Sequence, residues 1–339
     1  MKAKLFHRTE FYLALMIVLV CLVFGGINGS FYSASHILDL LRACIVKGIF
    51  AMGCLLVIIS GGMDVSFPAI AAFSYYLTVK IFTSGSEPTG SLLSMIMLSA
   101  LFGAILGMIN GWLVATLKIP PLIITLGTSS IFGGVLLNFI GSTEIMIVPD
   151  YVLEFSRTNL ITIKQGNVTT GLNVGFLFLI AVVVLVALLL RYTMLGRGIY
   201  TVGGNPDAAK RVGLPVKPIL MFVYTAAGMC AGLAGIVYNM MFKWIQPKDL
   251  TTQGPMMVIA AVVLGGANIT GGKGTVLGTV LGLLLITIVN NSMILVGIPS
   301  VAQTFFVGVA VLVGVGVSSY QNLRASRRVH EVEADENQG

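Results

Sequence analysis

Long apolar runs, separated by short polar stretches, recur along the whole chain. A helix needs about 20 apolar residues to cross a hydrocarbon core roughly 30 Å thick, and ten runs approach this length. They cover residues 11–29, 43–62, 65–83, 91–117, 122–140, 171–190, 219–242, 255–267, 275–296 and 300–319. The pattern predicts an all-α integral membrane protein, a polytopic bundle of about ten transmembrane helices. The third run contains Pro68 and the eighth is short, so both are candidates for re-entrant segments.

The first apolar run follows a basic start, MKAKLFHRTE, which resembles the n-region of a signal peptide. The apolar part is rather long for a signal peptide, however, and no A-x-A-like cleavage site follows it. These features favour a retained first span with a cytoplasmic N-terminus over a cleaved leader.

Lysine and arginine are unevenly divided between the two sides of the predicted bundle. If the N-terminus is inside and all ten runs cross, thirteen of the 20 are cytoplasmic: Lys2, Lys4, Arg8, Lys118, Arg191, Arg197, Lys210, Arg211, Lys217, Lys273, Arg324, Arg327 and Arg328. Five are external: Arg42, Arg157, Lys164, Lys243 and Lys248. The excess supports this topology, which places the N- and C-termini in the cytoplasm. It also accounts for the formal net charge of +7 without a nucleic-acid partner.

The composition fits one membrane domain surrounded by membrane lipid. The chain is 56% hydrophobic and 10% charged, and its 40 glycines suit close packing of membrane helices. We expect a single transmembrane domain over residues 1–323 and a polar, disordered cytoplasmic tail over residues 324–339. The four cysteines show no C-x-x-C spacing, so we expect them to pack in the bundle and not to serve metal or redox chemistry.

The predicted spans contain almost no ionisable residues, although ion-coupled carriers usually place such residues inside the membrane. The glycine-rich residues 265–275 do not form a P-loop. That motif needs glycine six positions before Lys273 and serine or threonine after it, where the chain has Ala267 and Gly274. No span pairs a histidine with an acid, so we expect no catalytic residue, no metal and no cofactor. Any ATP that drives uphill transport must then be bound by a partner.

A polar stretch at residues 191–217 separates two long apolar runs. Asn205 followed by Pro206 predicts the start of a short helix, and Gly213 predicts its end. Ala208 and Ala209 would give this helix a flat face of small residues, suited to a groove in another protein. The alternative is an ordinary solvated loop.

The residues DAAKRVG at 207–213 resemble the acid-Ala-Ala-x-x-x-Gly signature in membrane permeases of ATP-binding-cassette (ABC) importers. The longer stretch at 196–238 is similar to sugar permeases of the ribose, galactose and xylose importer family. So are ISGGMDVSFPAIAAFS, IPPLIITLGTSSIFGG, IAAVVLGGANITGGKGTVLGTVLG and NNSMILVGIPSVAQTFFVGVAVL. These motifs keep the family's order and cover most of the chain from about residue 55 to 315.

The resemblance implies a binding-protein-dependent importer in a bacterial plasma (inner) membrane. Residues 191–217 would be its cytoplasmic coupling loop, docking on an ABC ATPase subunit that binds the ATP. A periplasmic solute-binding protein would deliver the solute, and a second permease copy or a paralogue would complete the pathway. The residues implied in coupling are Asn205, Asp207, Ala208, Ala209 and Gly213.

Two departures from the family concern individual positions. Relatives usually carry Glu-Leu-Asp before the IAAVV motif, whereas this chain reads GPMMVIAAVV at residues 254–263. Relatives also usually have Val-Gly where this chain has Phe67 and Pro68. Roles of the acidic pair are therefore not transferred, and the geometry after Ser66 is left open.

Neutral amides and hydroxyls suit a sugar that must pass without being held tightly. The candidates for the translocation path are Thr125, Thr128, Asn290, Asn291 and Gln303, with Asp64 and Ser66 at the cytoplasmic end of the second run. For the amides and threonines the alternative is hydrogen bonding between helices, worth about 0.6 kcal/mol each in a membrane. Asp64 could cap the following helix, gate the path or be an ordinary loop charge.

Three classes of function compete. The main interpretation is an importer permease subunit with no catalytic residue. A stand-alone facilitator or channel for a small neutral solute fits the uncharged spans but does not explain the short helix predicted between Pro206 and Gly213. A membrane enzyme is disfavoured, because the three histidines lie near ends or in loops.

Overall fold

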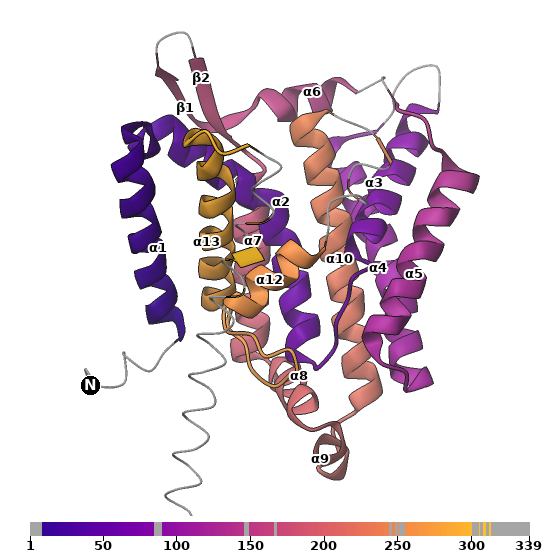
Figure 1. The fold of residues 1–339 in the computed structure, drawn as a ribbon. Coiled ribbons are helices and arrows are strands. Elements are labelled where there is room, and N and C mark those ends of the chain that lie inside the picture. The colour runs from indigo at the N-terminus through magenta and orange to yellow at the C-terminus, as the bar shows by residue number, and fades with distance from the viewer. Residues whose placement is uncertain are drawn as a thin grey trace, which may run out of the picture.

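The computed structural model describes residues 9–84, 90–145, 149–165, 168–243, 246–247, 250, 255–299, 305, 308–309 and 312. It is a bundle of mostly upright helices (Figure 1). The longer helices are α1 (Thr9–Ile27), α2 (Ala34–Ile59), α3 (Phe67–Thr83), α4 (Leu92–Leu117), α5 (Pro121–Val135), α7 (Phe176–Tyr192), α10 (Val216–Phe242) and α13 (Val276–Leu295). The shorter elements are η2 (Gly29–Tyr32), η3 (Leu136–Ile140), α6 (Asp150–Arg157), β1 (Asn159–Gln165), β2 (Val168–Asn173), α8 (Met194–Gly204), α9 (Pro206–Arg211) and α12 (Met256–Leu264).

The described residues contain fewer long apolar helices than the ten spans predicted for the whole chain. Among the described residues, six helices are long and apolar enough to cross a membrane: α1, α2, α4, α5 with η3, α10 and α13. Helices α7 and α8 pass the same test together but are bent by 77° where they meet. The two weakest predicted runs form short apolar helices, since α3 has 17 residues and α12 only nine. Most of the tenth run, 300–319, lies outside the described residues.

Two predicted boundaries were wrong. Helix α2 begins at Ala34, nine residues before the second apolar run, because the Ser33 side chain accepts a hydrogen bond from His36 N and caps the helix. Residues 171–173, assigned to the sixth run, belong instead to strand β2 of an antiparallel hairpin. Asn173 fixes this hairpin by donating to Phe155 O of α6 and accepting from Gly175 N.

Helix α2 is the central helix of the bundle and α1 is peripheral. Helix α2 packs against α7, α10, α12 and α13, and most of its side chains are buried. Helix α1 packs mainly on α13 and keeps most of its apolar surface exposed (Figure 1). Such an outward apolar face is expected for a helix bordered by lipid.

Helices α4 and α10 pack closely along each other, and glycine makes this approach possible. A β-carbon on Gly107 would lie 2.3 Å from Tyr224 O, and one on Gly228 would lie 2.3 Å from Gly103 O. Both distances are far below van der Waals contact. Glycines four residues apart on each helix therefore let the two backbones touch, as small residues do in membrane bundles.

Candidate functional site

Helix α9 lies at the tip of the molecule, at the end opposite β1, β2 and α6 (Figure 1). Its start is the predicted one, because Asn205 Oδ1 accepts from Asp207 N and Ala208 N, both at 3.0 Å, and Pro206 follows the cap. Its end is also the predicted one. Gly213 has φ +82°, and Leu214 N donates to Ala209 O at 3.0 Å, which closes the last turn.

The face that α9 turns to solvent differs from the one predicted. Ala209 is fully buried against the protein, so it cannot belong to an exposed small-residue face. Ala208 is exposed and is flanked by charge, with Asp207 Oδ1 and Lys210 Nζ 3.9 Å apart. The exposed face is made of Asp207, Ala208, Lys210, Arg211 and Val212.

Three backbone segments meet directly above α9, in a contact that we name the glycine junction: Gly61, Gly203, Gly271 and Gly272. A β-carbon on Gly203 would lie 1.8 Å from Ile59 O, and one on Gly271 would lie 2.7 Å from Gly61 Cα. Gly272 N donates to Ile59 O at 2.9 Å. The junction therefore ties the end of α8, from which α9 follows, to the end of α2 and to the α12–α13 loop.

A buried polar cluster occupies the break between α2 and α3. Asp64 is 3% exposed, and its Oδ1 accepts from Ser66 N at 2.7 Å and from Ser66 Oγ at 2.6 Å. Asn110 Nδ2 of α4 donates to Ser66 Oγ at 2.7 Å. Asp64 thus orders the turn that leads into α3, whereas the Ser66 side chain forms no helix cap of its own.

Thr125 holds α5 against the same break, and Thr128 bonds within its own helix. Val65 N donates to Thr125 Oγ1 at 3.3 Å, and Thr125 Oγ1 lies 3.2 Å from Met63 O. Thr128 Oγ1 donates to Thr125 O at 3.3 Å, and both threonines are buried. The Thr125 contacts are hydrogen bonds between segments, which was the alternative to lining a path. The substitution at Phe67 and Pro68 is accommodated at the start of α3, where proline suits a helix.

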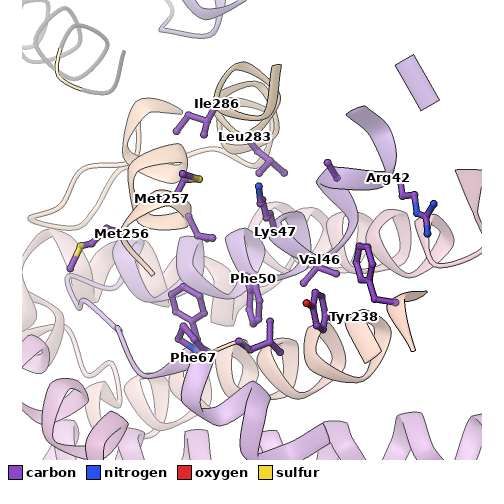
Figure 2. A pocket seen from close by; sticks show the side chains of 15 residues that line it. Arg42, Val46, Lys47, Phe50, Phe67, Tyr238, Met256, Met257, Leu283 and Ile286 are labelled. Carbon is purple, nitrogen blue, oxygen red and sulfur yellow. The ribbon is translucent and has the colours of Figure 1, made fainter. Parts of the chain in front are cut away.

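A cavity of about 580 Å³ lies between α2, α3, α10, α12 and α13 (Figure 2). Most of its lining is apolar, including the rings of Phe50, Phe67 and Tyr238. Two cations, Arg42 and Lys47 of α2, also line it. The start of α12 supplies the lining residues Met256, Met257 and Val258.

The predicted path residues lie at different distances from this cavity. Asn290 lies at its edge, with Nδ2 3.7 Å from Met257 Sδ, on the face of α13 that carries the lining residues Leu283 and Ile286. Asn291 is half-buried on the same helix, and Gln303 lies outside the described residues. Asp64, Ser66, Thr125 and Thr128 gather at the α2–α3 break and do not line the cavity.

Sequence reasoning missed Arg42, Lys47, Asn110 and the glycine junction. Arg42 was assigned to an external loop because the apolar run begins after it, yet α2 already includes it. The glycines at 103, 107 and 111, each four residues apart, are a signal that could have identified the α4–α10 contact.

Comparison with known proteins gives consistent matches over most of the chain. A family model described as branched-chain amino acid transport system / permease component matches residues 36–315. The ribose import permease protein of Bacillus subtilis is 33% identical over 302 residues, 88% of this chain and 89% of that protein. The xylose/arabinose import permease protein of Sulfolobus acidocaldarius is 29% identical over 329 residues, 96% and 89% of the two chains.

An autoinducer 2 import system permease protein of Photorhabdus temperata is 32% identical over 309 residues, 90% of each chain. No solved structure matches this chain significantly.

Proposed function

Because this chain belongs to the family described as branched-chain amino acid transport system / permease component, we propose that it forms the translocation path of an ABC importer for a sugar or sugar-like solute. The observation that carries the proposal is the match over residues 36–315, which includes α9, the glycine junction and every cavity-lining helix. The chain is a multi-pass membrane protein and a transport subunit, not an enzyme.

The solute class rests on the relatives and on the cavity. The relatives are import permeases for ribose, for xylose or arabinose, and for autoinducer 2. A cavity of about 580 Å³ lies within the usual range of small-molecule sites, roughly 300–1,000 Å³. Its aromatic rings and the Asn290 amide can contact the apolar faces and hydroxyls of a sugar.

An importer permease of this family works with an ATPase subunit and a solute-binding protein. We place the ATPase contact on the exposed face of α9, since that helix is capped at both ends and projects from the bundle (Figure 1). A second permease copy or a paralogue completes the path, and the ATPase binds the ATP.

Uptake should depend on ATP hydrolysis by the partner and not on an ion gradient, because permeases of this family work with an ATPase subunit. Proteoliposomes containing permease, ATPase and binding protein should accumulate solute only when ATP is supplied. The matched control contains the permease alone under an imposed proton gradient. Accumulation in that control would contradict the proposal, and rapid downhill flux without any partner would favour a stand-alone facilitator.

We further place both termini and α9 in the cytoplasm of a bacterium, with the permease in its plasma membrane. The cation asymmetry supports this side, and α9 lies at the same end of the bundle as the start of α1, where Thr275 Oγ1 donates to Glu10 Oε1.

Cysteine labelling of intact cells with an impermeant reagent tests this topology. Asp207→Cys on α9 should stay unlabelled until the cells are opened. Lys164→Cys, on the hairpin at the opposite end, should be labelled at once, because Lys164 is exposed. Ready labelling at position 207 from outside would reverse the assignment.

A further inference from the structure

We propose that the cavity between α2, α3, α10, α12 and α13 binds an anionic group, so that the transported solute is an acidic sugar derivative with a carboxylate or a phosphate. This inference rests on the proposed function, because it names the solute class for the same path. It begins from the two cations in a mostly apolar lining (Figure 2).

Arg42 and Lys47 face the cavity from α2, together with the lining residues Val46 and Phe50 on the following turns. No hydrogen bond or ion pair within the described part of the chain involves the Lys47 ammonium. The Arg42 guanidinium lies 5.6 Å from the centre of the Phe242 ring, and its buried Nε has no hydrogen-bond partner. Both side chains therefore have donors available to a ligand.

No aspartate or glutamate belongs to the lining that the structure describes. Asp39 lies one turn before Arg42 on α2, but it neither lines the cavity nor forms an ion pair with Arg42. A cation within a spanning helix is costly and usually marks the path of a substrate or an ion. Among the described residues no side chain supplies the negative charge that would compensate Arg42 and Lys47, and an anionic solute would supply it.

The start of α12 adds positive potential at the same place. Its first residues, Met256 to Val258, line the cavity, and no side chain caps this helix start. Backbone N–H groups and the helix dipole favour an anion at such ends.

The remaining lining suits the uncharged part of a sugar. Aromatic rings at Phe50 and Tyr238 offer flat apolar surfaces, and Asn290 places an amide at the edge. The cavity therefore combines an anion subsite at the two cations with a surface for a hydroxylated carbon skeleton.

Thermal unfolding of the purified full-length permease, in nanodiscs of zwitterionic lipid, tests the anion subsite. The probes are D-gluconate and D-glucose at equal ionic strength, which share a six-carbon skeleton and differ in charge. Gluconate should raise the melting temperature more than glucose does. Lys47→Met should weaken gluconate binding about tenfold, as expected for a half-buried ion pair, and Lys47→Arg should retain it.

Lys80→Met is the matched control, since Lys80 is also a span lysine but lies on α3 away from the cavity, where its ammonium donates to Ile140 O. It should leave the gluconate effect unchanged. Equal stabilisation of the unsubstituted protein by both probes would overturn the proposal. So would Lys47-dependent stabilisation by phosphatidylglycerol nanodiscs to which gluconate adds nothing, because the anion would then be a lipid headgroup.

The binding measurement needs neither the ATPase nor the binding protein. A failure here would therefore remove the acidic solute class and leave the importer assignment intact. Absence of ATP-driven uptake in the proteoliposomes would remove the importer assignment and leave the anion subsite intact.

Discussion

Replacing Gly203 with alanine is expected to remove most of the folded permease from the membrane. The added β-carbon would lie 1.8 Å from Ile59 O and 2.8 Å from Gly272 N, and both of these atoms are backbone atoms that cannot rotate away. Moving them would break the hydrogen bond between Gly272 N and Ile59 O. We expect a loss of about 4 kcal/mol or more in the free energy of unfolding, at the exceptional end of single substitutions.

The neighbouring Gly204 provides the control, because a β-carbon there meets no atom within 4 Å. Gly204→Ala should keep the melting temperature and membrane level of the unsubstituted protein. Thermal unfolding in detergent, followed by size-exclusion chromatography, measures both variants. If Gly203→Ala had the same melting temperature as Gly204→Ala, the ends of α8 and α2 and the α12–α13 loop would not be in close backbone contact.

The expected effect also bears on transport. The junction is the place where α8, and therefore α9, is fixed to the end of α2 and to the α12–α13 loop. The same α12–α13 loop connects the two helices that line the cavity from one side. A movement of α9 on an ATPase would therefore be transmitted to the cavity through backbone contacts, without flexible side chains between them.

Local signals in the sequence predicted α9 well. Asn205 and Pro206 determine the start of the helix through the cap hydrogen bonds, and Gly213 adopts the left-handed conformation that ends it. These effects depend on neighbours within a few residues. The orientation of the helix depends on what it packs against, which is why the burial of Ala209 was not foreseen.

Hydropathy predicted where apolar helices occur but not the residues at which each helix begins and ends. It missed the first turns of α2, since Asp39 and Arg42 lower the local average while the Ser33 cap starts the helix before them. It also extended the sixth run into strand β2, where the apolar and small residues of the hairpin continue the run. Capping and strand pairing are separate from average hydrophobicity, so a window of hydropathy does not detect them.

The cavity could not be predicted from the sequence, because its lining comes from α2, α3, α10, α12 and α13, which are distant in the chain. Lys47 and Met257 acquire a common role only when these helices pack together. Of the predicted path residues, Asn290 reaches the edge of the cavity, and Asp64 and Thr125 instead order the α2–α3 break. Polar residues in apolar segments thus have two different positions, one beside the cavity and one in the α2–α3 break.

Ala208→Glu on the exposed face of α9 is expected to abolish ATP-driven uptake while leaving the permease folded. In the isolated chain the new carboxylate would lie in water, so the stability should change by less than about 0.5 kcal/mol. In an ATPase groove the same carboxylate would be buried without a partner, which typically costs about 3–5 kcal/mol. That cost corresponds to a loss of more than about a hundredfold in affinity.

The matched control is Lys217→Gln, which also changes an exposed charge on this loop but lies beyond α9, at the start of α10. It should retain uptake, since a solvated surface cation contributes little. Co-purification with the ATPase and solute uptake, each normalised to the permease level in the membrane, separate docking from folding. The Ala208 side chain is exposed in the isolated chain. A loss of uptake at a normal permease level would therefore indicate a lost contact with a partner and not a folding defect. Full uptake and ATPase retention by Ala208→Glu would show that α9 is a solvated connector, and the coupling surface would have to lie elsewhere.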